Sequence, residues 1–167
     1  YFSAKFAIMR KTIYSLLVLI SLITSCSDEK TAFSLKGQIS GLSSDTLLVY
    51  YQVPEYKLDT IVCQDGIFEY TFEPDTTTMF SLIFNAEESL PIFAEKGQNV
   101  QVTGSLGELK IQGKGDNEVM NEILLLLKDT PNRNTKQIVD SLIRTNHQSF
   151  TNRYLIDKYY TLDKRPN

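Results

Sequence analysis

The chain has 167 residues, of which 42% are hydrophobic and 22% are charged, and its formal net charge is −3. This composition supplies enough apolar residues for one ordinary domain and excludes an intrinsically disordered chain. Lys and Arg are scattered along the sequence, which excludes the basic stripe typical of nucleic-acid-binding proteins.

The first predicted element is an N-terminal signal peptide. Arg10 and Lys11 precede an apolar segment, residues 12–23. This segment is shorter than the roughly 20 residues of a membrane-spanning helix but typical of the hydrophobic region of a secretory signal. Met9 stands directly before the two basic residues, so we expect the natural start there, with the preceding residues as an upstream extension. Residues 1–25 are therefore excluded from the predicted fold.

Cys26 follows this signal directly. An apolar residue and two small residues, Ile23-Thr24-Ser25, come immediately before it. This segment resembles the lipobox of bacterial lipoproteins. The resemblance implies that diacylglycerol is attached to the Cys26 sulfur through a thioether, that the chain is cleaved before Cys26, and that the new amino terminus is acylated. Two or three acyl chains anchor a protein stably to a membrane. The alternative is a secreted protein, cleaved nearby, with Cys26 free or paired.

The residues after Cys26 predict the cellular address. Asp28 and Glu29 resemble the acidic signals of Gram-negative lipoproteins that avoid retention in the inner membrane or are exported to the surface. This implies an outer-membrane lipoprotein of the cell envelope, facing the periplasm or the cell surface, with residues 26–32 as a lipidated, solvated tether. Removing residues 1–25 takes away three basic residues and no acid, so the formal charge falls from −3 to −6. An acidic chain does not favour adhesion to anionic lipid, and the acyl chains must therefore supply the anchor.

Cys63 is the second cysteine and lies in a β-like run, residues 60–64. With Cys26 lipidated, Cys63 has no partner for a disulfide within the chain. It is then either a free thiol or a small buried hydrophobic residue, and we favour the buried residue. The sequence contains no CxxC pair in which a second thiol could resolve a disulfide.

The region from 33 to 113 predicts a mainly β domain. Short runs rich in β-branched and aromatic residues alternate with turn residues, which is typical of an antiparallel β-sandwich of about eight strands. The clearest hairpin turns at Asp65-Gly66, after which Phe68, Tyr70 and Phe72 alternate with polar residues. The expected strands are residues 33–40, 45–53, 58–64, 67–73, 78–85, 90–95, 99–104 and 108–112.

The region from 114 to 167 predicts two or three α-helices. After Gly115 the apolar spacing changes from two to about 3.6, the period of a helix. Asp116 or Asn117 is expected to cap a first helix that extends to residue 128, with Pro131 stopping it. A second helix is expected to start at Thr135 and a third to cover residues 152–162.

The third expected helix carries aromatic residues that no following segment of this sequence covers. They are Phe150, Tyr154, Tyr159 and Tyr160, together with Leu155. A contiguous exposed apolar patch normally marks an interface. We therefore expect residues 150–167 to be the least protected part of the fold, or to be covered by self-association or by a partner.

The sequence offers no catalytic constellation. His147, the only histidine, lies in a polar stretch without a metal-binding pattern, so we expect a surface residue, no metal site and no cofactor. The segment from Gly113 to Asn117 lacks the phosphate-loop pattern and is better explained as a helix cap. Glu87 and Glu88 are expected to be solvated loop charges unless the fold brings other groups near them.

Several short motifs carry a family resemblance. They are FSLKGQISG (33–41), DTLLVYY (45–51), DTIV (59–62), DGIFEY (65–70), PIFAEKGQNVQVTG (91–104) and IQGKGDNEVMNE (111–122). Their order resembles a domain of unknown function, DUF4369, that precedes a thioredoxin-like module of the alkyl hydroperoxide reductase/thiol-specific antioxidant type in many Gram-negative lipoproteins. The resemblance implies that the helical segment leads toward such a module, whose CxxC is not in this sequence. No catalytic residue is therefore carried over, and the chain is a truncated gene, a fragment or a stand-alone accessory domain.

The expected function follows from this resemblance and from the lipobox. We expect an outer-membrane lipoprotein whose domain is a non-catalytic accessory or positioning module for a thioredoxin-like domain or protein. The first alternative is a ligand-binding or protein-binding lipoprotein unrelated to redox chemistry, because sandwich domains often bind through their loops. A second alternative is an enzyme in its own right. The membrane is expected as a partner through the lipid anchor, and nucleic acid is not.

Overall fold

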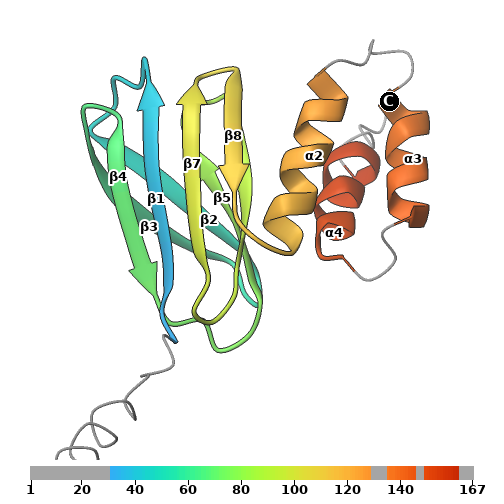
Figure 1. The fold of residues 1–167 in the computed structure, drawn as a ribbon, viewed down its shortest axis with the longest axis horizontal. Coiled ribbons are helices and arrows are strands. Elements are labelled where there is room, and N and C mark those ends of the chain that lie inside the picture. The colour runs from blue at the N-terminus through green and yellow to red at the C-terminus, as the bar shows by residue number, and fades with distance from the viewer. Residues whose placement is uncertain (1–30, 129–134, 146–148, 162–167) are drawn as a thin grey trace, which may run out of the picture. The chain divides into compact units, whose positions relative to one another are not determined.

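The computed structural model describes residues 31–128, 135–145 and 149–161, and the chain from Thr31 onward forms one compact unit. Over the described residues eight strands come first and helices follow (Figure 1). The strands are β1 (Phe33–Ser40), β2 (Thr46–Val53), β3 (Lys57–Gln64), β4 (Ile67–Phe72), β5 (Thr78–Ile83), β6 (Ser89–Ala94), β7 (Asn99–Ser105) and β8 (Glu108–Gln112). The helices are α2 (Asp116–Lys128), α3 (Thr135–Thr145) and α4 (Thr151–Ile156), and α4 continues as the π-helical turn η1 (Asp157–Thr161). The predicted fold class, mainly β with C-terminal helices, is confirmed.

The element boundaries lie close to the predicted ones. Strand β5 ends two residues early because the Asn85 side chain accepts hydrogen bonds from the N–H groups of Glu87 and Glu88, at 2.8 and 2.9 Å, and forms a turn. The predicted hairpin turn is present, with positive φ at Asp65 (52°) and Gly66 (76°). The predicted stop at residue 131 and the end of the third helix at 162 lie outside the described residues.

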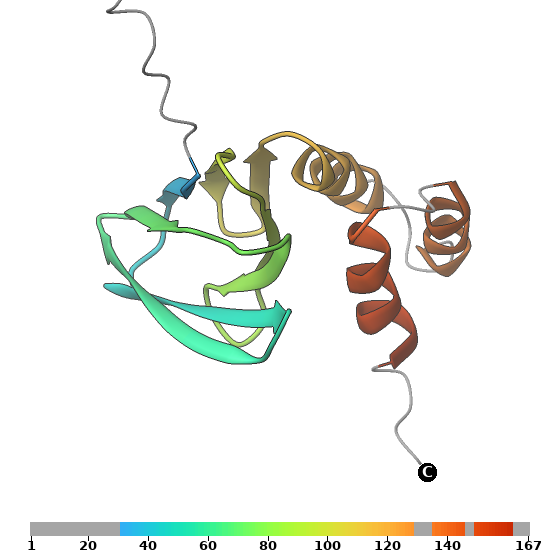
Figure 2. The ribbon, with the colours of Figure 1, turned by 90° about the horizontal axis from the view of Figure 1, so that it is seen from below.

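The strands form a single curled sheet in the order β6-β5-β2-β3-β4-β1-β7-β8. Neighbouring strands are antiparallel except for β1 and β7, which are parallel. Strands β3 and β4 pair at only two positions beside their hairpin, Cys63 with Phe68 and Gln64 with Ile67. The sheet bends there into two halves that face each other (Figure 2).

The core fills the space between these two halves. Alternate residues of each strand point inward, so Leu47 and Val49 of β2 are fully buried while the intervening Leu48 is 46% exposed. Burying one such apolar side chain contributes roughly 1.5–3 kcal/mol. Further fully buried core residues are Phe33, Leu35, Phe80, Leu82, Ile92 and Val102.

Helix α2 closes the side of the sandwich where the two edge strands, β6 and β8, lie. The Asn117 amide accepts the N–H of Phe93 in β6 (3.0 Å) and donates to the carbonyl of the same residue (2.6 Å). One helical turn later, Asn121 accepts the N–H of Ile111 in β8 (2.9 Å). Edge strands expose unpaired backbone groups, and each one buried without a partner costs about 1–3 kcal/mol. Asn117 is fully buried and is therefore a strand-edge cap and not the predicted helix cap.

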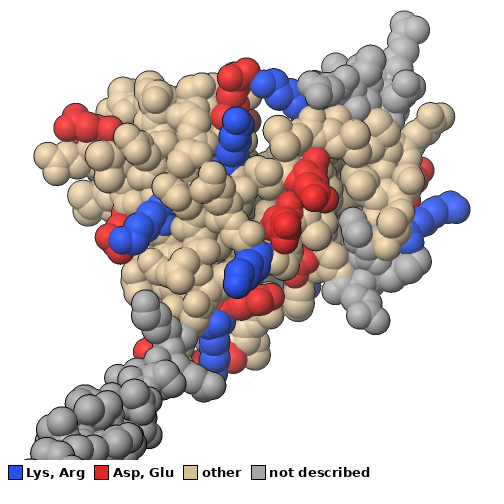
Figure 3. All heavy atoms as spheres, in the orientation of Figure 1, with Lys and Arg blue, Asp and Glu red and all other residues tan. Residues whose placement is uncertain are grey.

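The surface charges are interspersed. On the face shown in Figure 3, Lys and Arg lie beside Asp and Glu without a continuous surface of one sign. Ion pairs such as Lys36 with Glu69 (3.1 Å) and Lys128 with Glu108 (2.6 Å) are exposed. Exposed pairs of this kind are screened by water and add little to stability. The core and the helix contacts therefore determine most of the stability.

Candidate functional site

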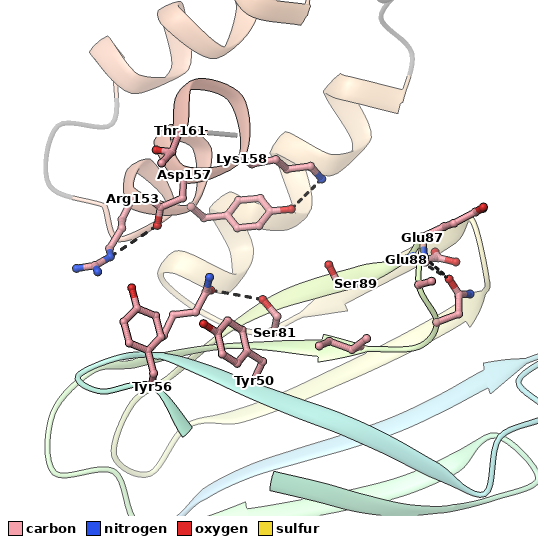
Figure 4. Close-up of a pocket in the computed structure, with 15 residues that line it drawn as sticks. Tyr50, Tyr56, Ser81, Glu87, Glu88, Ser89, Arg153, Asp157, Lys158 and Thr161 are labelled. Carbon is pink, nitrogen blue, oxygen red and sulfur yellow. Dashed lines mark hydrogen bonds and ion pairs between the residues drawn. The ribbon is translucent and has the colours of Figure 1, made fainter. Parts of the chain in front are cut away.

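A groove of about 560 Å³ lies between the outer face of the sheet and the last helix (Figure 4). Strands β2, β5 and β6 form its floor, and α4 with η1 forms its roof. The turn between β5 and β6 forms one end. All three parts belong to the same compact unit.

The floor carries Tyr50 of β2 and several polar side chains, and Tyr56 of the loop between β2 and β3 lies beside Tyr50. The rings of Tyr50 and Tyr56 are nearly parallel, at 18°, with centroids 6.0 Å apart. Tyr56 is 73% exposed, so one of its faces is open to solvent. Deeper in the floor, the Ser81 hydroxyl donates a long hydrogen bond to Gln52 (3.4 Å). An open aromatic surface thus lies beside the buried Ser81 and the half-buried Gln52.

The roof carries two cations and one acid, and one of the cations contacts the acid. Arg153 Nε lies 3.9 Å from the Asp157 carboxylate, one helical turn along the chain. Lys158 donates a hydrogen bond to the hydroxyl of Tyr154 (2.9 Å). Burial lowers the pKa of Lys158, but contact with Tyr154 and Tyr159 outweighs this effect and the pKa is raised. Lys158 is therefore a stable cation at neutral pH.

The π-helical turn η1 determines which roof residues face the groove. Asp157, Lys158 and Thr161 all come from it. π-Helical turns are rare and occur frequently at functional sites, because the extra residue per turn changes the direction of the side chains. The turn is held to α3 by a hydrogen bond from Tyr160 to Asp140, and Lys136 of α3 lies 5.0 Å from the Tyr160 ring centroid.

The end wall contains the two glutamates that the sequence placed in a loop. Glu88 accepts a hydrogen bond from the N–H of Gly107 (2.6 Å), which ties the β5–β6 turn to the β7–β8 turn. Glu87 is exposed at the rim of the groove. The fold places both in the same groove as Arg153 and Lys158, which their spacing in the sequence did not predict.

A second polar cluster lies where β3 and β4 are unpaired. Tyr70 donates a hydrogen bond to Asp59 (2.8 Å), and the hydroxyls of Tyr70 and Tyr51 are also hydrogen bonded. Burial raises the pKa of Tyr70 strongly, and the hydroxyl of Tyr51 and the carboxylate of Asp59 raise it further. The hydrogen bond that Asp59 accepts from the N–H of Thr60 lowers the pKa of Asp59 most, and the hydrogen bond from Tyr70 lowers it further. Tyr70 therefore stays protonated and joins the two halves of the sheet.

The structure places Cys63 in the core, 2% exposed, as its strand position predicts. Burial raises the pKa of its thiol. A buried thiol with a raised pKa does not form the thiolate that acts as a nucleophile or metal ligand. Cys26 and His147 lie outside the described residues, so lipidation of Cys26 stays a prediction.

The predicted aromatic interface residues do not form one exposed surface. Tyr154 is only 8% exposed and its neighbour Leu155 is fully buried, because α4 packs against α2 and α3. Phe150 is 40% exposed, whereas Tyr159 and Tyr160 are half-buried. Of these residues, the groove contains Tyr154.

The described ranges hold no group of three or more His, Cys, Asp or Glu side chains placed to bind a metal ion. Within the same ranges, no helix has the length and apolarity needed to cross a membrane.

Sequence reasoning missed most of the groove. Its residues come from segments that are far apart in the chain, such as Tyr50, Ser81 and Arg153, and no motif connects them. Local patterns predicted the strands and helices. They did not predict that the last helix lies over the outer face of β2, β5 and β6. The sequence had singled out three of its residues, Tyr154 through the aromatic pattern of the last helix and Glu87 and Glu88 as neighbouring loop acids.

Comparison with known proteins identifies the family of this chain. The search of curated proteins finds no match. The family model described as "Domain of unknown function (DUF4369)" matches residues 33–120. The match runs from the first residue of β1 into α2 and so includes the strand-edge cap Asn117. The chain therefore belongs to the DUF4369 family.

Proposed function

We propose that this chain is a non-catalytic binding or positioning module of a cell-envelope lipoprotein, anchored to the outer membrane through lipid on Cys26. The observation that carries the binding role is the groove between β2, β5, β6 and α4–η1. The support for the anchor is the sequence Ile23-Thr24-Ser25-Cys26 after an apolar segment.

The groove is suited to binding because strands and helical turns form most of its floor and its roof. Concave sites with an apolar surface and a few placed polar groups are the usual form of ligand sites. Several of its ionisable groups have partners within the chain: Arg153 contacts Asp157, and Glu88 accepts a hydrogen bond from the Gly107 backbone. Such groups can bind and orient a ligand. The described cysteine, Cys63, is buried in the core and is not exposed to a ligand in the groove.

Two kinds of partner fit this role. The family resemblance supports a thioredoxin-like domain or protein, which the module would hold away from the membrane. The groove supports a second candidate, a ligand-binding lipoprotein unrelated to redox chemistry, because all its described walls come from this chain.

Metabolic labelling with an alkyne palmitate analogue tests the anchor. The full chain, expressed in a Gram-negative host, is expected to incorporate the label and to partition into detergent. Cys26→Ala is expected to lose both properties, whereas the matched variant Cys63→Ala keeps the label. Label retained in Cys26→Ala would contradict the proposed anchor.

Insulin reduction tests the non-catalytic role. A dithiol cycle needs two thiols whose α-carbons lie about 4.4–6.8 Å apart, and lipidation leaves only Cys63. With dithiothreitol as reductant, the full chain is expected to give the same rate as the buffer blank. A higher rate that Cys63→Ser abolishes would show that the chain is an enzyme.

A further inference from the structure

We propose that the groove between the sheet and α4–η1 binds a neutral saccharide. This inference rests on the proposed role as a binding module and names the class of its ligand. The argument uses the aromatic floor, the balance of charges, the kinds of polar groups and the state of the nearby strand edge.

The tyrosine pair provides a flat apolar surface for a sugar ring. Tyr50 and Tyr56 are tilted by only 18° and present their faces on the outer side of the sheet (Figure 4). The face of an aromatic ring carries negative charge and attracts the positive edge of C–H groups. One side of a pyranose ring consists of C–H groups, so it can pack on the open face of Tyr56.

The charges of the groove favour a ligand without net charge. The groove is lined by two cations, Arg153 and Lys158, and by three acids, Asp157, Glu87 and Glu88. Most of them already have partners, because Arg153 contacts Asp157, Lys158 contacts Tyr154, and Glu88 contacts the Gly107 backbone. A site that recruits an ion by charge concentrates one sign, and this groove does not.

The uncharged polar groups match hydroxyls. Gln52, Asn85, Ser89 and Thr161 line the groove, and each side chain can both donate and accept hydrogen bonds. Asn85 uses its carbonyl oxygen on Glu87 and Glu88, and its amide nitrogen remains a donor. A sugar hydroxyl also donates and accepts, so it can pair with any of these groups. Neighbouring hydroxyls can also bridge a donor and an adjacent acceptor.

A peptide is a poorer match for the same groove. Peptides that bind to sheets add a strand to an open edge and pair through their backbone. Strand β6 is the edge strand of the groove floor, but Asn117 of α2 occupies its backbone at Phe93. Pro91 in the same strand has no N–H to donate.

The size of the groove agrees with an oligosaccharide. Its volume of about 560 Å³ lies within the ~300–1,000 Å³ usual for small-molecule sites. Strands and a helix form the floor and roof, so little ordering is needed on binding. Preformed sites of this kind lose less free energy to ordering when a ligand binds.

An array of neutral hexose and N-acetylhexosamine oligosaccharides, followed by calorimetry on the bound compounds, tests the proposal. The full chain in detergent is expected to bind at least one of them. Tyr56→Ala is expected to weaken this binding roughly five- to tenfold through loss of the ring, and Tyr56→Phe to preserve it. Tyr56 is exposed, so its replacement should not affect folding. Val62→Ala, at an 80% exposed position outside the groove, is the matched control and should bind normally.

Three outcomes would overturn the saccharide assignment. They are no binding across the neutral array, binding that Tyr56→Ala leaves unchanged, and binding of a peptide array that depends on Tyr56. None of them alters palmitate labelling of Cys26, so a failed ligand class and a failed anchor are distinguished. If the chain binds a saccharide but does not incorporate the palmitate label, the saccharide assignment stands and the proposed lipid anchor is wrong.

Discussion

Gly37 is a position where a single methyl group has no space. It lies in β1 opposite Phe68 of β4, and a Cβ atom built on it would lie 2.0 Å from Cζ of the Phe68 ring. The ring, which is 4% exposed, therefore covers the glycine directly. The absence of a side chain at Gly37 is what allows Phe68 to enter the core.

We expect Gly37→Ala to lower the free energy of unfolding by about 2 kcal/mol, because overpacking a core typically costs ~1–3 kcal/mol. Urea denaturation measures this change, with the exposed neighbour Gln38→Ala as the control. In a Phe68→Leu background the additional cost should shrink, since the clash is removed. If Gly37→Ala costs the same free energy with Phe68 present and with Phe68→Leu, the Phe68 ring is not the cause of the destabilisation.

Tyr70 predicts a response to alkaline pH. In the folded state burial raises the pKa of Tyr70 above the ordinary value of about 10, and the hydrogen bonds with Tyr51 and Asp59 raise it further. A raised folded pKa contributes stability that is complete below the unfolded pKa and is lost as the pH rises toward the folded pKa. The free energy of unfolding should therefore start to fall near pH 10.

Urea midpoints measured from about pH 8 to 11 check this expectation. Tyr70→Phe cannot ionise and should show a shallower alkaline decline than the unmodified chain. Tyr56→Phe removes an exposed hydroxyl and should follow the unmodified chain. Identical declines for the two variants would contradict the assignment to Tyr70.

At the scale of elements, two asparagines decide how well α2 closes the sandwich. Asn117 makes two hydrogen bonds with the Phe93 backbone and a third with Gln98 (2.9 Å), whereas Asn121 makes one with Ile111. We expect Asn117→Ala to cost about 3 kcal/mol, because it leaves buried N–H and C=O groups unpaired. Asn121→Ala should cost about 1 kcal/mol for the same reason.

Chemical denaturation of both variants measures these costs, and Asn99→Ala at an exposed position is the control. Asn117→Asp provides a sharper comparison, because its carboxylate can accept from the Phe93 N–H but cannot donate to the Phe93 carbonyl. It should therefore be nearly as destabilised as Asn117→Ala. A loss for Asn117→Ala no larger than for Asn99→Ala would mean that the edge of β6 does not need this cap.

The sequence predicted the elements because their signals are local. Alternation predicted the strands, Asp65-Gly66 the hairpin and the change of period the helices. The parallel pairing of β1 with β7 and the edge contact of Asn117 were not predicted, because both join segments far apart in the chain. Asn117 illustrates the difference: as a residue type it predicted a helix cap, but its position relative to β6 gave it another role. The groove was missed for the same reason.

At the scale of the whole molecule, strands and helices form one unit. The predicted division at residue 113 is thus a change of element type within that unit. A chain ending at residue 113 should lose cooperative unfolding and aggregate, because the edges of β6 and β8 are uncovered. A chain ending at residue 128 retains α2 and should stay monomeric.

Circular dichroism during urea unfolding, together with light scattering, compares these two truncated chains with the full chain. The longer one should unfold cooperatively at a lower midpoint, since it lacks α4 and the buried Leu155. Cooperative unfolding of the shorter chain at the full midpoint would show that the strands are stable without α2.

The closure by α2 also imposes an order of events when the chain is made. All eight described strands precede the helix in the sequence, so both sheet edges are complete before Asn117 and Asn121 exist to cover them. At ~5–20 residues per second, the interval between completing β6 and adding Asn121 lasts a few seconds. During that interval the β6 edge of each nascent chain is uncovered until Asn117 is added, and the β8 edge is uncovered from residue 112 until Asn121 is added. Uncovered edges can pair with strands of neighbouring chains. The two asparagines that protect the sheet edges are thus made after the strands. Any pause in translation between residues 94 and 121 prolongs the time for which an edge is uncovered.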